Sequence, residues 1–237
     1  MNRNRILLGG GAAVVAIIAL GAWWLGFFTD APDEVDVDVL AEAVQAQADA
    51  DGADTADAVT SLDGTWTITP VEDQTFIGYR IDEVLTTIGD FEVVGRTAEV
   101  AGTLEGSGTS ITAVDVVADM TAITTDNPAR DNAMRNQALE TSDFPEATFS
   151  LAEPIDVGVI PSGPAILEVT AVGDLTIHGV TQRVDFPLQA QLVSGSIVVT
   201  GQLQIALADY DISAPTAPIV ASVEDVALLE LSLVFGR

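Results

Sequence analysis

The sequence predicts an all-β protein whose C-terminal part is a closed antiparallel barrel of about eight strands with one short helix. Three observations support this prediction. After residue 64, apolar and polar side chains alternate in many runs, several of them ten residues long or more. Short segments rich in Gly, Ser and Pro separate these runs. A hydrophobic segment and then an acidic segment precede them, which places the barrel in residues 64–237.

The hydrophobic segment predicts a transmembrane helix in residues 1–28. Residues 6–28 carry no charge, and 23 residues in a helix are enough to cross about 30 Å of hydrocarbon. Arg3 and Arg5 precede the segment and acids follow it, so the positive-inside rule places the N-terminus in the cytoplasm. A cleaved signal peptide is the alternative, but the apolar run is long for one. We expect an uncleaved single-pass anchor in the cell membrane, with the rest of the chain extracytoplasmic.

Residues 29–63 predict a disordered acidic tether. They carry 11 acids and no base, and they are rich in Ala, Asp and Gln. A helix over residues 39–50 would be transient, because the segment has no apolar face of useful width. We therefore expect a solvated spacer between the membrane anchor and the barrel.

The alternating runs are typical of half-buried strands in an antiparallel sheet with one face in water. The clearest runs cover residues 114–122, 167–177, 184–192, 199–207 and 229–235, and weaker runs cover 66–68, 75–81, 98–104 and 147–151. A sandwich and a closed barrel both fit so many strands, and the length of the runs favours the barrel. Asp126, Asn127 and Pro128 predict a helix start, followed by a short helix over residues 129–139.

Composition excludes several classes of function. The chain has no cysteine, no lysine and a single histidine, which removes thiolate metal sites and Schiff-base chemistry. Its net charge of −28 argues against a nucleic-acid partner. We expect a protein that is not an enzyme, with no catalytic residue, no metal and no cofactor. A hydrolase that uses two of the carboxylates is kept as an alternative.

The single histidine, His178, lies between two of the alternating runs. Together with Gly179 it predicts a tight hairpin turn rather than a catalytic base. Arg130, in the predicted short helix, is a candidate to hold a polar or anionic group. Apolar and aromatic residues on the predicted strands and the helix are candidates for the barrel interior. They include Phe76, Tyr79, Phe91, Met120, Leu139, Phe144, Phe149, Ile177 and Phe186.

Two motifs resemble signatures of the YceI-like family. Residues 127–131 (NPARD) followed by residues 142–149 (SDFPEATF) are similar to its Arg-Asp helix start and F-P-x-A-x-F strand entry. Residues 173–181 (GDLTIHGVT) are similar to its G-x-L-T-I-H-G-V-T signature. The likeness extends over roughly residues 64–235. It departs at Asp211, where glycine is common.

The resemblance implies an extended lipocalin-like barrel that binds a polyisoprenoid lipid outside the cytoplasm. Together with the interior candidates, it gives a predicted ligand-binding set of Arg130, Asp131, Phe76, Tyr79, Leu139, Phe144, Phe149, Ile177, His178 and Phe186. We expect a membrane-tethered protein that sequesters or carries an isoprenoid-type lipid or quinone. The alternative is an adhesion or scaffold domain with a filled barrel and a protein partner. Homodimer formation is left open.

Overall fold

The computed structural model describes residues 31–51, 59–86, 89–161, 163–216, 218 and 220–237. The chain divides into two units, and the second, Pro32–Arg237, contains the barrel. The predicted membrane anchor in residues 1–28 lies outside the described residues. Within the described residues, every helix is too short or too polar to span a membrane.

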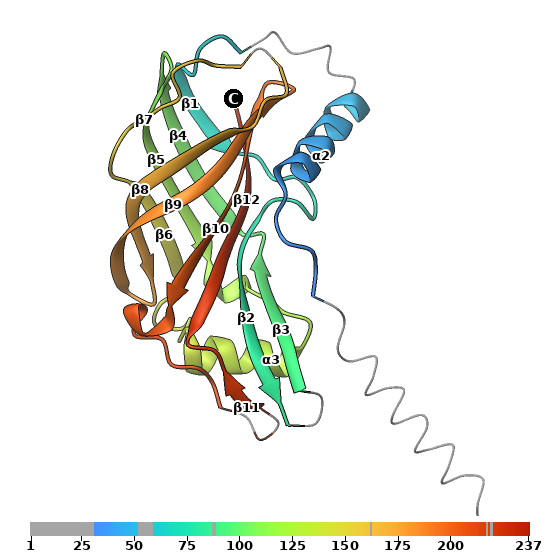
Figure 1. Ribbon diagram of the computed structural model, residues 1–237, viewed down its shortest axis with the longest axis vertical. Helices are drawn as coiled ribbons and strands as arrows, with labels where there is room; N and C mark the ends of the chain where they lie inside the picture. The colour runs from blue at the N-terminus through green and yellow to red at the C-terminus, as the bar shows by residue number, and fades with distance from the viewer. Residues whose placement is uncertain (1–30, 52–58, 87–88, 162, 217, 219) are drawn as a thin grey trace, which may run out of the picture. The chain divides into compact units, whose positions relative to one another are not determined.

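Within the described residues, eight antiparallel strands close into a barrel (Figure 1). They pair in the order β1-β4-β5-β6-β8-β9-β10-β12, and β12 pairs back to β1. Their bounds are β1 Gly64–Ile68, β4 Val100–Ser107, β5 Ser110–Asp119, β6 Glu146–Leu151, β8 Leu167–Ile177, β9 Val180–Val193, β10 Ser196–Ala206 and β12 Val226–Gly236. The predicted all-β antiparallel barrel with a short helix is confirmed.

A second set of strands extends one side of this wall. From Ser232 to Leu228, β12 pairs with β2 (Phe76–Leu85) instead of β1. Strand β2 in turn pairs with β3 (Gly89–Thr97) and β11 (Val220–Val223). Separately from this set, the short strand β7 (Ile155–Asp156) pairs with β5 of the barrel. These three partner strands were missed from the sequence, because β7 and β11 are very short and Gly95 interrupts the apolar face of β3.

Two-residue turns join the long hairpins as predicted. His178 and Gly179 connect β8 to β9 with φ angles of 52° and 73°, and Ile177 pairs with Val180 across the turn. Positive φ at both positions matches the right-handed twist of the strands. Asp211, where the family commonly has glycine, also has a positive φ of 54°. Its short polar side chain tolerates the left-handed conformation that glycine adopts freely.

The predicted short helix is confirmed, and it has two parts. Asn127 caps α3 (Pro128–Ala133) by accepting a 2.9 Å hydrogen bond from the Ala129 amide. The chain continues as the wider turn η2 (Met134–Ala138). The alternating run over residues 114–122 ends earlier than predicted, because the Asp119 carboxylate caps the short helix η1 (Met120–Ala122). A further short helix, η3 (Leu207–Tyr210), follows β10.

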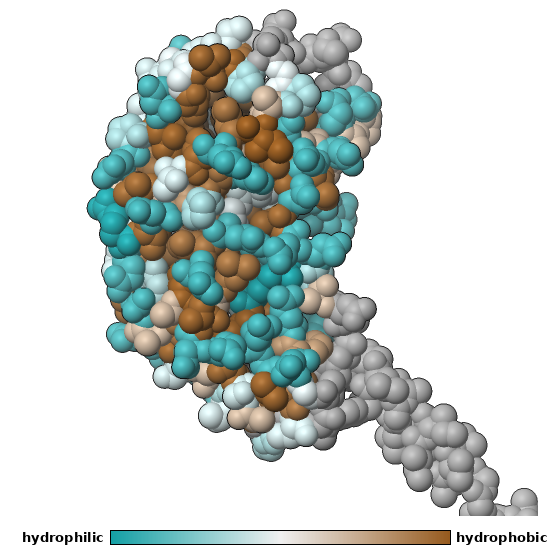
Figure 2. All heavy atoms as spheres, in the orientation of Figure 1, coloured by the Kyte–Doolittle hydropathy of each residue, from teal (hydrophilic) through white to brown (hydrophobic). Residues whose placement is uncertain are grey.

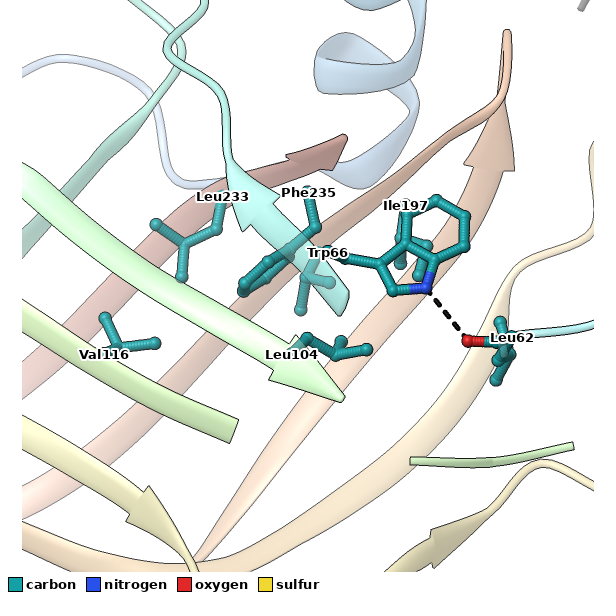
Figure 3. Close-up of a cluster of buried hydrophobic side chains, with 8 residues drawn as sticks. Leu62, Trp66, Leu104, Val116, Ile197, Leu233 and Phe235 are labelled. Carbon is teal, nitrogen blue, oxygen red and sulfur yellow. Dashed lines mark hydrogen bonds between the residues drawn. The ribbon is translucent and has the colours of Figure 1, made fainter. Parts of the chain in front are cut away.

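One end of the barrel interior is filled by a hydrophobic cluster centred on Trp66 (Figure 3). Trp66 is fully buried, and its indole Nε1 donates a 3.0 Å hydrogen bond to the carbonyl of Leu62. Leu233 and Phe235 of β12 point into the same cluster. Most members of this cluster also line the open interior space, so the cluster forms part of its wall: Leu104, Val116, Ile197, Val199, Leu233 and Phe235.

The prediction of a solvated tether is wrong over residues 37–50, which form helix α2 (Val37–Ala50). The Asp36 carboxylate caps its first turn, accepting from the Asp38 amide at 2.8 Å. A narrow stripe of Val37, Leu40, Ala41 and Val44 is buried, spaced as one helix face requires. In Figure 2 the visible surface of α2 is mostly hydrophilic, so the acids of this segment remain in water.

Candidate ligand-binding cavity

The barrel interior contains a cavity of about 240 Å³ whose walls are mainly aliphatic and aromatic. Strand residues reach it because alternate side chains point inward. Six of the ten predicted site residues line it: Tyr79, Arg130, Leu139, Phe149, Ile177 and Phe186. An apolar cavity of about 150 Å³ already stays dry and admits small apolar molecules. This interior is therefore able to accept part of an apolar chain.

Two glycines shape the aromatic part of the wall. A Cβ at Gly173 would lie 2.3 Å from Cζ of Phe149, so only glycine lets that ring lie against β8. The Phe149 ring meets the Phe186 ring edge-to-face with centroids 6.5 Å apart. At Gly201 a Cβ would lie 2.5 Å from Cδ2 of Leu188 and 3.0 Å from Cε1 of Phe186. Because glycine has no side chain, the aromatic rings beside these two positions can lie close to the wall.

Charged groups in the cavity wall are concentrated around Arg130 of α3. Its Nη2 atom lies 2.6 Å from Oε1 of Glu83, an inward-facing residue of β2, and Nη1 pairs with Asp126. The Arg130 and Glu83 side chains are only 13% and 7% exposed. The guanidinium carbon also lies 5.3 Å from the centroid of the Phe91 ring. Arg130 thus lines the cavity as a paired cation.

Tyr79 places a neutral polar group close to this pair. Its hydroxyl lies 3.1 Å from Sδ of Met134, and burial raises its pKa well above the usual value. A Cβ at Gly95 would lie 2.4 Å from Cε1 of Tyr79, so the glycine makes room for the ring. The phenol is protonated at neutral pH, so Tyr79 is an uncharged polar group in the wall, and its hydroxyl donates to the Met134 sulfur.

The other four predicted site residues do not line the cavity. Asp131 accepts hydrogen bonds from the amide and hydroxyl of Thr125, both at 2.7 Å, and so holds the loop before α3. The guanidinium carbon of Arg96 lies over the Phe76 ring, 4.0 Å from the ring centroid. Phe144 packs edge-on against His178 with ring centroids 4.5 Å apart. Asp131, Phe76 and Phe144 therefore contact other residues of the protein and not the cavity.

His178 makes two hydrogen bonds beyond its turn. Its Nδ1 atom lies 3.1 Å from the carbonyl oxygen of Tyr210, and its Nε2 atom lies 3.0 Å from Oε2 of Glu140. A Cβ at Gly179 would lie 2.6 Å from Cε1 of Phe144, so the turn and the aromatic ring are closely fitted. The turn role predicted for His178 is confirmed.

Several residues of the wall were missed from the sequence. Glu83 is the most important, and alternation was the available signal, since position 83 continues the inward series of Ile77, Tyr79 and Ile81. The remaining missed residues are mostly aliphatic, including Val199, Ile205, Leu229 and Leu231. Among the described residues, no three His, Asp or Glu side chains converge in the way a metal site needs.

Comparison with solved structures finds a chain of the same fold with a TM-score above 0.5 and further chains with lower scores. A polyisoprenoid binding domain from Saccharophagus degradans superposes with a TM-score of 0.56 at 18% identity, covering 73% of this chain and 98% of that one. BcnA from Burkholderia cenocepacia has a TM-score of 0.48 at 16% identity, with coverage of 67% and 95%. A YCEI protein from Campylobacter jejuni has a TM-score of 0.48 at 18% identity, with coverage of 59% and 82%.

Comparison with curated proteins found no match to this sequence. The family comparison is decisive, because the YceI-like domain matches residues 66–235, which is most of the chain and the whole barrel apart from its first and last residues. The barrel, its two signature segments and this match lead to one conclusion: the chain belongs to the YceI-like domain family.

Proposed function

We propose that this protein binds an uncharged isoprenoid-type lipid in its barrel and carries or stores it without chemical change. The observation that carries the proposal is the apolar cavity of about 240 Å³. Each Å² of apolar ligand surface removed from water contributes about 25 cal/mol, so a long hydrocarbon chain needs few polar contacts. The polyisoprenoid binding domain of similar fold supports the same class of ligand.

The charges in the wall favour a ligand with an uncharged head group. Arg130 is already paired with Glu83 and Asp126, so an anionic head group would have to compete with two carboxylates. The net charge of −28 adds a further repulsive field. A hydroxyl or a quinone carbonyl avoids both costs, and the neutral hydroxyl of Tyr79 lies in the same wall.

We also propose that residues 6–28 anchor the protein in the cell membrane with the barrel outside the cytoplasm. The length of this uncharged run and the arginines before it support that location. An anchored barrel would stay near the bilayer that supplies an isoprenoid. The scaffold alternative requires a filled barrel, and the open cavity counts against it.

The proposal is tested by analysing the lipids that co-purify with the full chain. The protein is purified from its membrane fraction, washed with a competing detergent and extracted with organic solvent, and the extract is analysed by mass spectrometry. We expect one class of neutral isoprenoid, close to one molecule per chain. An extract with no isoprenoid, from a protein that also takes up none when isoprenols are added, would overturn the proposal.

A further inference from the structure

The segment before the barrel domain is attached to the outside of the barrel. Residues 32–50 precede the part of the chain that matches the family, residues 66–235. Along α2, the buried stripe packs on Val198 of β10 and Val234 of β12, whose side chains point outward from the barrel. Val71, in the connection between β1 and β2, completes this cluster. The contact is a second hydrophobic cluster, separate from the barrel interior.

Polar contacts hold both ends of the segment. At the C-terminal end, the Ser194 hydroxyl donates a 2.7 Å hydrogen bond to Oε1 of Gln45. Before the helix, Gln202 Nε2 donates a 3.0 Å bond to Glu34. The segment therefore runs along the wall from β2 and β3 to the turn between β9 and β10, as Figure 1 shows for α2.

The strongest polar contacts come from a buried cluster of charges on the outer face of β2, β3 and β12. The carboxylate of Glu230 has no exposed surface and lies between two guanidiniums, 2.9 Å from Nε of Arg80 and 2.7 Å from Nε of Arg96. The Arg80 side chain is only 4% exposed. Its Nη1 atom reaches Glu92 at the rim of the cluster, at 2.9 Å.

The Nη2 groups of the two arginines bind the backbone of the segment. Nη2 of Arg80 donates to the carbonyls of Pro32 and Asp33 at 2.6 Å and 2.5 Å, and Nη2 of Arg96 donates to Asp33 at 2.9 Å. Buried guanidinium N–H groups require acceptors, and here main-chain carbonyls supply them. If the segment left, these groups and the valines of β10 and β12 would lose their cover.

We propose that residues 32–50 are a fixed strap of the barrel, clasped by Arg80 and Arg96, and not part of a flexible tether. A flexible chain covering residues 29–63 would separate its ends by about 30 Å on average. With the strap docked, Pro32 and Asp33 lie at the outer face of β2 and β3. If residues 6–28 enter a bilayer, only residues 29–31 of the sequence separate them from the strap. The strap does not depend on what the cavity binds.

The test uses the absence of natural cysteine. In the full chain, Gln45→Cys and Ser194→Cys place two thiols at a contact of the strap, whereas Gln45→Cys and Ser222→Cys place the second thiol on distant β11. Dibromobimane becomes fluorescent when both of its arms react with nearby thiols. We expect fast intramolecular cross-linking of the first pair and none of the second. Equal cross-linking of the two pairs would overturn the strap.

A matched pair of substitutions in α2 sharpens the test. Leu40 is 1% exposed and its neighbour Val39 is 54% exposed on the same helix. Leu40→Asp should slow cross-linking of the Gln45–Ser194 pair about tenfold, because docking would bury an unpaired carboxylate. Val39→Asp should leave the rate unchanged. Equal rates for the two variants, with unchanged circular dichroism of the barrel, would contradict docking through this face.

Discussion

Two arginine–glutamate clusters, one inside the barrel and one outside it, use the same chemistry for different ends. The inner pair, Arg130 with Glu83, lies in the wall of the cavity. The outer cluster joins Glu230 to Arg80 and Arg96, and backbone carbonyls cover it. Burial, with hydrogen bonds from both arginines to Glu230 and to backbone carbonyls, makes the outer cluster structural. The inner pair faces open space, so its charge balance affects what enters.

The largest effect on stability is expected at the outer cluster. Glu230→Gln leaves two adjacent guanidiniums without their buried carboxylate, and we expect a loss of about 3–5 kcal/mol in the free energy of unfolding. Glu92→Gln is the matched control, since Glu92 pairs with the same Arg80 but is 41% exposed. It should cost less than about 1 kcal/mol. Similar losses for both variants, measured by denaturant unfolding, would contradict the distinction.

The second effect tests the cavity. Ala171 is buried and lines it, so Ala171→Phe should fill space needed by a ligand and abolish isoprenol uptake. Overpacking should reduce stability by about 1–3 kcal/mol. Ala101→Phe, at an exposed position on β4, is the control and should bind as the parent does. Retained uptake by folded Ala171→Phe protein would place the ligand elsewhere.

The third effect tests the inner pair. Glu83→Gln removes one carboxylate that competes for Arg130, so affinity for an isoprenyl phosphate should rise about tenfold, in line with one charged hydrogen bond. Affinity for the corresponding isoprenol should change little. Titration with both ligands measures the ratio of the affinity for the isoprenyl phosphate to the affinity for the isoprenol. An unchanged ratio would show that the pair does not select the head group.

The smallest effect is expected at His178. His178→Asn keeps a residue that accepts the positive φ of the turn, but it loses contacts to Tyr210 and Glu140. We expect less than about 1 kcal/mol of destabilisation and unchanged isoprenol affinity. A large loss of affinity in a folded variant would return His178 to the binding site.

The barrel could be predicted because a strand with one face in water and one face buried alternates polar and apolar residues along the sequence. The same alternation shows why Phe76 should not have been expected in the cavity wall. Phe76 and Tyr79 lie on opposite faces of β2, so both could not point into the cavity. Aromatic character alone does not decide the direction of a strand residue. Arg130 was identified as a candidate, whereas its pairing with Glu83 joins positions 47 residues apart and needed the fold.

The docked strap was missed because its apolar stripe is narrow and lies among acids. A signal was nevertheless present on the barrel side. Alternation fails at 197–199 (IVV) and 233–235 (LVF), where consecutive apolar residues indicate burial on both faces of the strand. Val198 and Val234 are the middle residues of these runs, and both pack against α2.

The central claim, that the cavity binds an uncharged isoprenoid, is tested most directly by equilibrium binding of farnesol and farnesyl diphosphate to the full chain. The parent protein and the Ala171→Phe variant are compared, because both keep the hydrophobic N-terminal segment. We predict that the parent binds farnesol at one molecule per chain and in preference to the diphosphate, and that the variant binds neither. Equal farnesol binding by both proteins would contradict the claim.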